Sequence, residues 1–183
     1  MTVIVHENKK LSSLPTLMET QDIINELSMG TDKLSKEEFI RIALEKYPKF
    51  DAWSPLVYYR TDGTVLETDL ILVSLRGAIA YKMGGDLHIN YGDLESGSPQ
   101  VSVNILGDQH TLQLGRAVAS TFLTVPDIYK GIKEADLQVI HLDGQSHQCH
   151  ILNLEWKLNK PEADTDLVEK TVKVLNADLP TEE

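Results

Sequence analysis

The chain is poor in cysteine and in long apolar runs. Its 183 residues include one cysteine, Cys149, so no disulfide can form within the chain, and a reducing compartment suits it. No run of about 18 apolar residues is present that could cross a membrane, and the first ten residues lack the charged-then-apolar order of a secretion signal. We therefore expect a cytoplasmic protein with no membrane-spanning segment.

Basic residues are also scarce. The chain has 17 Lys and Arg against 28 Asp and Glu, a formal net charge of -11. Proteins that bind nucleic acids usually neutralise phosphates with Lys and Arg, so DNA binding would need a local basic strip. The same acidity suits a protein that docks on a basic surface of a partner.

The length and an apolar content of 42% suit one domain, or one domain with a smaller appendage. The patterns predict an α+β fold in four segments. Residues 1–50 form an N-terminal helical unit and residues 51–125 a β-rich region. Residues 126–176 form a hairpin-plus-helix module, and residues 177–183 form a polar tail.

Two helices are predicted in the first segment. Apolar spacing predicts one over residues 17–29. A capping box, in which the Ser35 hydroxyl bonds the amide of Glu38, opens another that ends before Pro48. The second helix carries more acidic than basic residues, which favours packing or docking over DNA reading.

The second segment alternates in the manner of strands. We expect strands over residues 53–59, 65–66, 70–74, 87–91, 101–106 and 110–114, with a hairpin turn at Gly107-Asp108. A helix is expected over residues 115–123, and a second helix, opened by Pro161, near the end of the chain.

The stretch from Leu137 to Trp156 carries the candidate site. A short apolar strand over residues 137–140 delivers His141, and a second strand is expected over residues 154–158. Between them lie a turn at Asp143-Gly144 and a polar loop that Asn153 closes. Because imidazole titrates near neutrality, His141 is a candidate for proton transfer.

Two motifs in this stretch resemble the HNH nucleases of phages and introns. They are His141-Leu142-Asp143-Gly144 and, after eight residues, Asn153-Leu154-Glu155-Trp156. Upstream, residues 53–56 and 73–79 resemble the NUMOD4-like motif that often precedes HNH domains in phage nucleases. The resemblance implies a ββα-metal module that grips a divalent ion such as Mg, with His141 activating a water against a DNA phosphodiester. It implies Asn153 as a second catalytic or metal-binding residue.

The chain departs from the HNH pattern around this site. Ile140 stands where the family has a metal-binding Asp or Asn, Gln148-Cys149 replaces an Asn pair, and Gly115 replaces a His. Glu162 stands where a further Asn ligand is expected. The resemblance thus leaves Asn153 and Glu162 as candidate metal ligands and implies that cleavage is impaired or lost. The candidate DNA contacts are Arg116, Lys130, Lys133 and Lys157.

Other interpretations of the same residues remain open. Thiolate and imidazole are zinc ligands, so His147, Cys149 and His150 are an alternative metal site, although their spacing is tight for one tetrahedral ion. Instead of a nuclease, the protein could be a non-catalytic acidic binder or inhibitor that docks on a host enzyme handling nucleic acids. A third alternative is a structural or assembly protein.

Overall fold

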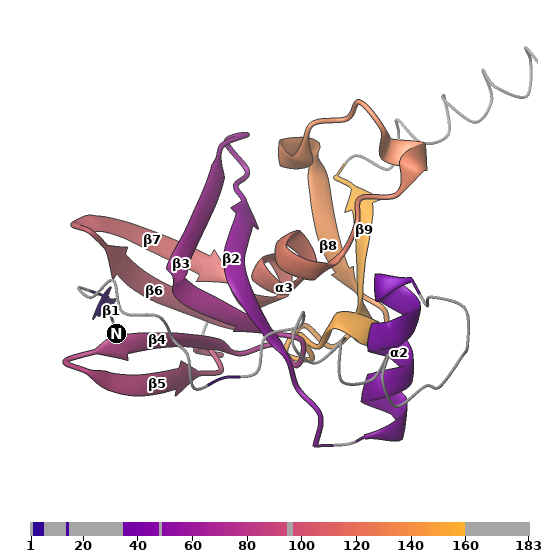
Figure 1. Cartoon of the computed structure of the whole chain (residues 1–183). Coiled ribbons are helices and arrows are strands. Elements are labelled where there is room, and N and C mark those ends of the chain that lie inside the picture. The colour runs from indigo at the N-terminus through magenta and orange to yellow at the C-terminus, as the bar shows by residue number, and fades with distance from the viewer. Residues whose placement is uncertain (1, 6–13, 15–34, 48, 95–96, 160–183) are drawn as a thin grey trace, which may run out of the picture.

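The computed structural model describes residues 2–5, 14, 35–47, 49–94 and 97–159. The fold is α+β, with two helices and three small sheets in these ranges (Figure 1). No helix within them is long and apolar enough to span a membrane. The helices predicted over residues 17–29 and after Pro161 lie outside the described residues, as does Glu162.

The largest sheet is an antiparallel meander of four strands, in the order β2-β3-β4-β5. The strands are β2 (Trp53–Tyr59), β3 (Val65–Ser74), β4 (Ile79–Met83) and β5 (Asp86–Asn90). The register between β2 and β3 shifts at Pro55/Leu56, as expected where proline cannot donate to the ladder. The predicted strands are confirmed here, and residues 65–66 and 70–74 belong to one continuous strand.

A second sheet joins distant parts of the chain in the order β1-β6-β7. β1 (Thr2–Val5) runs parallel to β6 (Gln100–Ile105), which pairs with β7 (Asp108–Gln113). The β6–β7 turn predicted at Gly107-Asp108 is one residue off. The turn residues are Leu106 and Gly107, with φ of 52° and 103°, the positive values that a two-residue hairpin loop requires.

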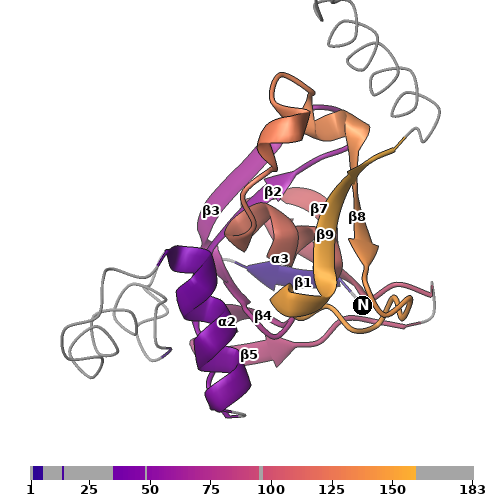
Figure 2. The same cartoon turned by 90° about the vertical axis from the view of Figure 1, so that its right-hand side faces the viewer.

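Helix α3 (Leu114–Phe122) is the centre of the fold. Both views place it between the β2–β3 strands and the hairpin of β8 (Leu137–His141) and β9 (Leu154–Leu158) (Figures 1 and 2). Nearly every residue of α3 is buried because strands cover it on two sides. Three short 3₁₀ turns, Asp127–Tyr129, Glu134–Asp136 and Ile151–Asn153, complete the connections around the hairpin.

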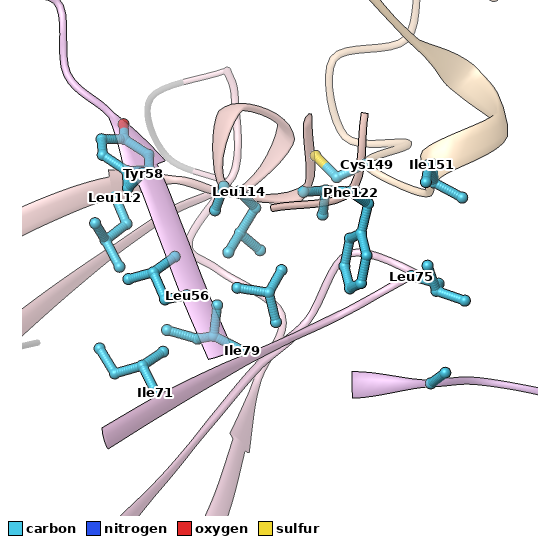
Figure 3. Packing of buried hydrophobic residues seen from close by; sticks show 14 of the residues in the cluster. Leu56, Tyr58, Ile71, Leu75, Ile79, Leu112, Leu114, Phe122, Cys149 and Ile151 are labelled. Carbon is cyan, nitrogen blue, oxygen red and sulfur yellow. The ribbon is translucent and has the colours of Figure 1, made fainter. Parts of the chain in front are cut away.

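One hydrophobic cluster draws on all the segments that the structure describes after residue 35. It runs from Phe39 on α2 (Lys36–Lys46), through the sheets and α3, to Leu154 on β9. Figure 3 shows part of it, with Leu56, Ile79, Phe122 and Cys149 packed together. The predicted cap of α2 is confirmed, since the Glu38 amide donates to the Ser35 hydroxyl over 3.2 Å. The described parts of the first three predicted segments therefore share a core, and the predicted segment boundaries stay predictions.

Candidate functional site

The β8–β9 hairpin places His141 at the end of β8, where the loop that connects the two strands begins. His141 is the last residue of β8 and pairs with Leu154, the first residue of β9. The loop between them starts with a tight turn, in which the Gly144 amide donates to the His141 carbonyl over 3.0 Å. The Leu142 amide donates to the Asn153 carbonyl over 2.8 Å, which closes the loop. The imidazole is thus carried by a fixed backbone rather than by a free loop.

Asn153 clamps this loop from inside. Its side chain is 5% exposed. The amide oxygen accepts from the Asp143 backbone N–H over 3.0 Å, and the amide nitrogen donates to Asp143 Oδ1 over 2.9 Å and to the Gln148 carbonyl over 2.8 Å. Both the oxygen and the nitrogen of the amide thus form hydrogen bonds within the loop, and these bonds hold the two sides of the loop together.

The imidazole of His141 lies against α3 at Gly115. A Cβ atom at position 115 would lie 3.2 Å from His141 Nε2 and 3.3 Å from its Cε1, closer than carbon atoms normally approach. Any side chain larger than hydrogen would therefore press on the ring. The sequence shows Gly115 only as a departure from the HNH pattern; in the structure it makes room for the imidazole.

Cys149 is the second residue that packs against the imidazole ring of His141. Its sulfur lies 3.7 Å from His141 Nε2 and 3.5 Å from the Ser146 carbonyl, to which the thiol donates. Cys149 is 4% exposed, and this burial raises the pKa of its thiol to about 11, although a hydrogen bond from the Gly115 backbone acts in the other direction. The thiol is therefore protonated at neutral pH and serves as a packing and hydrogen-bonding group.

The zinc alternative gains no support from this geometry. Zinc sites need several ligand side chains around one point, and Cys149 lies inside the hydrophobic cluster. Within the described ranges, no three His, Cys, Asp or Glu side chains are grouped so that they could hold a metal ion. His147 and His150 thus do not form a ligand set with Cys149 there.

The electrostatics of the site favour a neutral imidazole. Burial lowers the pKa of His141 below its ordinary value; the Asp143 carboxylate opposes this, and His147 adds to it. Burial also lowers the pKa of His150, with Asp143 again opposing. A neutral His141 near pH 7 has a free lone pair, which is what proton abstraction requires.

Arg116, a predicted DNA contact, points into the protein. It is 6% exposed. Its guanidinium donates to the backbone carbonyls of Tyr59, of Leu137 over 2.7 Å and of Glu134 over 2.8 Å, and it lies over the Trp156 ring at 5.4 Å. These contacts tie β2 to β8 and use three of the five guanidinium N–H groups. We therefore assign Arg116 a structural role, although it also lines the pocket that contains His141.

The predicted lysine contacts lie on the surface around the hairpin. Lys130 and Lys133 are exposed in the connection before β8, and Lys157 is exposed on β9. The Lys157 ammonium lies 3.9 Å from Glu155 Oε2, with both side chains about half exposed. These three lysines stay predicted DNA contacts.

The described residues do not provide a cradle for a divalent ion. Ile140 is half-buried on β8 and has no donor atom. The Asn153 amide oxygen already accepts a hydrogen bond inside the loop. A hard cation needs several oxygen ligands, so the residues around His141 do not fit the metal that the HNH resemblance implies.

His141 opens onto a pocket of about 300 Å³. Its described lining residues come from β8, α3, the site loop and the β5–β6 connection, and they include no Asp or Glu. Thr61 and Gln113 also line a second pocket of about 360 Å³, between β7 and the end of β2. The two pockets thus adjoin, and we call the pair the His141 groove.

The chain matches no protein-family model and no curated protein. Among solved structures it is similar to the HNH homing endonuclease I-HmuI, in a structure described as DNA binding and cleavage. The TM-score is 0.38 and the sequence identity 23%, over 55% of this chain and 53% of that one. The chain therefore spans about half the length of that protein. A likeness of this extent fixes neither the family nor the activity of the chain.

Proposed function

We propose that this protein is an HNH-endonuclease-like, DNA-associated protein whose phosphodiester cleavage is impaired or lost. One observation carries the proposal: a clamped hairpin holds a neutral His141 at a pocket whose described lining has no carboxylate. In a chain with 28 acidic residues, an acid-free pocket beside a proton acceptor suits an anionic substrate such as a phosphodiester. The motifs at residues 141–144 and 153–156 support the same function, and a phage origin rests on the family resemblance alone.

The chemistry left to the chain's own residues is limited. His141 can accept a proton from a water that approaches the pocket, and the Asn153 clamp and Gly115 keep its ring in place. Nothing among the described residues replaces the carboxylate or amide that Ile140 lacks. General-base catalysis alone contributes about 10² to 10⁴-fold, far less than phosphodiester cleavage requires. We therefore expect DNA association to survive better than cleavage.

The test is nicking of supercoiled plasmid by the purified protein with Mg, Mn, Ni and Zn in turn. Ile140→Asn restores an oxygen donor without placing a second carboxylate opposite Glu155, its partner across the hairpin. We expect weak or no nicking by the wild type and more by Ile140→Asn. The double variant Ile140→Asn/His141→Ala should be inactive.

His88→Ala is the matched control, because His88 lies on β5, stacks on Tyr81 and lines neither part of the His141 groove. Its nicking should equal that of the wild type. Nicking that survives the loss of His141 would contradict the assigned base. Failure of the wild type to retain DNA in the presence of EDTA would contradict DNA association, and a pull-down of protein partners from host cells would then be the next step.

A further inference from the structure

The far end of the His141 groove holds an arginine–histidine pair that the candidate site does not use. Arg60 follows β2, and His110 lies in the middle of β7. Arg60 Nη2 lies 3.0 Å from His110 Nδ1. A guanidinium has donors only, so Nδ1 must accept and the proton of the ring lies on Nε2. The pair therefore offers a positive charge and a ring N–H donor together.

The rest of this pocket is rich in hydrogen-bond donors. Its described lining adds two threonine hydroxyls and the amides of Gln100, Gln109 and Gln113. The one carboxylate in this described lining, Asp62, accepts at Oδ1 from the Thr64 amide over 2.8 Å and from the Thr64 hydroxyl over 2.6 Å, and its negative charge partly offsets that of Arg60. Phosphate oxygens only accept hydrogen bonds, so a pocket of N–H and O–H groups around an arginine suits a phosphate.

The position of the pair links it to the site at His141. Thr61 and Gln113 line both pockets, so the lining is continuous from His141 to His110. A nucleic-acid strand carries a phosphate at every nucleotide. A strand with one phosphate beside His141 would present a flanking phosphate to the adjoining pocket. In the two pockets together, Asp62 is the one acidic residue among the described lining.

We propose that Arg60 and His110 form a second phosphate subsite, which holds a flanking phosphate of the strand whose scissile phosphate lies beside His141. The subsite rests on the proposed function, because it takes the same strand. It places a positive charge at this end of the groove, in a chain whose net charge is -11. Binding there needs no metal and no cleavage.

The test is binding of a fluorescein-labelled DNA oligonucleotide to the full chain, by anisotropy in EDTA at several salt concentrations. Arg60→Gln should weaken binding about tenfold, the typical effect of losing a hydrogen bond to a charged group. It should also reduce the slope of log affinity against log salt by about 1, as for one phosphate contact. Arg41→Gln is the matched control. Arg41 is an exposed arginine on α2, bonded to Glu45, and it should leave both values unchanged.

Arg60 also donates to the Thr64 hydroxyl at the β2–β3 turn, so Arg60→Gln could weaken binding by disturbing the fold. A second variant therefore tests the subsite without changing Arg60. Gln109→Glu adds a negative charge to the pocket from an exposed position and should weaken binding in the same direction. Affinities of Arg60→Gln and Gln109→Glu equal to that of Arg41→Gln would overturn the subsite, even if plasmid nicking is observed. Weakened binding without any nicking would support the subsite and contradict surviving catalysis. No DNA binding by the wild type would overturn both proposals.

Discussion

Replacing Gly115 by alanine tests whether the imidazole of His141 sits where the structure places it. Alanine favours a helix interior over glycine by about 1 kcal/mol. Gly115 is the second residue of α3, where we expect roughly half of that gain. This gain is opposed by the close contact of the new Cβ, which would lie 3.2 Å from His141 Nε2. Moving the ring off its preferred rotamer costs about 0.5–1.5 kcal/mol, so the net effect on the free energy of unfolding should be zero or a small loss.

The same substitution in a His141→Ala background removes the opposing contact. Leu154 Cδ2 would then be the nearest neighbour of the new Cβ, at an ordinary 3.7 Å. Gly115→Ala should now stabilise the protein by about 0.5 kcal/mol. The difference between the two backgrounds is the coupling energy of the double-mutant cycle, and we expect about 0.5–1.5 kcal/mol.

Urea denaturation of the four proteins at pH 8, where His141 is neutral, measures this coupling. The experiment needs neither DNA nor metal, so it tests the geometry apart from the function. An equal effect of Gly115→Ala in both backgrounds would refute the placement of the ring against α3. If the ring is displaced as expected, any nicking by Ile140→Asn should fall when Gly115→Ala is added.

Three further predictions concern the clamp, the buried arginine and pH. Asn153→Ala should lower the free energy of unfolding by about 2–3 kcal/mol, since it leaves loop groups without partners; Asn153→Asp should cost more in urea denaturation, because its carboxylate would face that of Asp143. Arg116→Lys should cost about 2–3 kcal/mol, because an ammonium cannot reach three diverging carbonyls, yet DNA affinity in EDTA should be unchanged; a reduced affinity of the folded variant would restore Arg116 as a DNA contact. Burial lowers the pKa of His141 and of His150 below the ordinary 6.5, so the unfolded chain takes up protons first as pH falls. Stability from these groups is full above about pH 6.5 and is lost as pH falls toward their lowered pKa values, and His141→Ala should reduce the fall of Tm measured over that range.

Local patterns predicted the frame of the site well. The second strand expected in the hairpin is β9, and its predicted bounds, Leu154–Leu158, are confirmed. The pattern from Ser35 to Glu38 predicted the cap of α2. Leu106 was predicted as the last residue of a strand, but in the structure it is a residue of the β6–β7 turn. A leucine with φ of 52° is disfavoured by its own backbone preference, so the pairing of β6 with β7 decides its conformation.

The residues that contact the imidazole of His141 could not be predicted from the sequence. Gly115 and Cys149 meet His141 through packing of α3 against the site loop, and no local spacing encodes that contact. Arg116 likewise finds acceptors 57, 21 and 18 positions away in the chain. From sequence alone, an arginine beside a nuclease-like motif suggests a phosphate ligand. In the structure Arg116 is buried, which depends on the whole fold, and its hydrogen bonds connect β2 with β8.

The net charge of -11 is compatible with the DNA binding that we propose for the His141 groove, because distant charges and the groups lining the groove act over different distances. Charges farther apart than about 8–10 Å are largely screened at physiological ionic strength. A phosphate inside the His141 groove would therefore respond mainly to the residues that line it, which include the charged Arg60, Arg116 and Asp62 beside His110, His141 and the uncharged donors. The acidic remainder of the surface acts on approach, where it repels DNA and slows encounter. If the proposed DNA binding holds, this combination of weak steering and local retention predicts slow association with DNA and a larger effect of the groove residues on dissociation than on association.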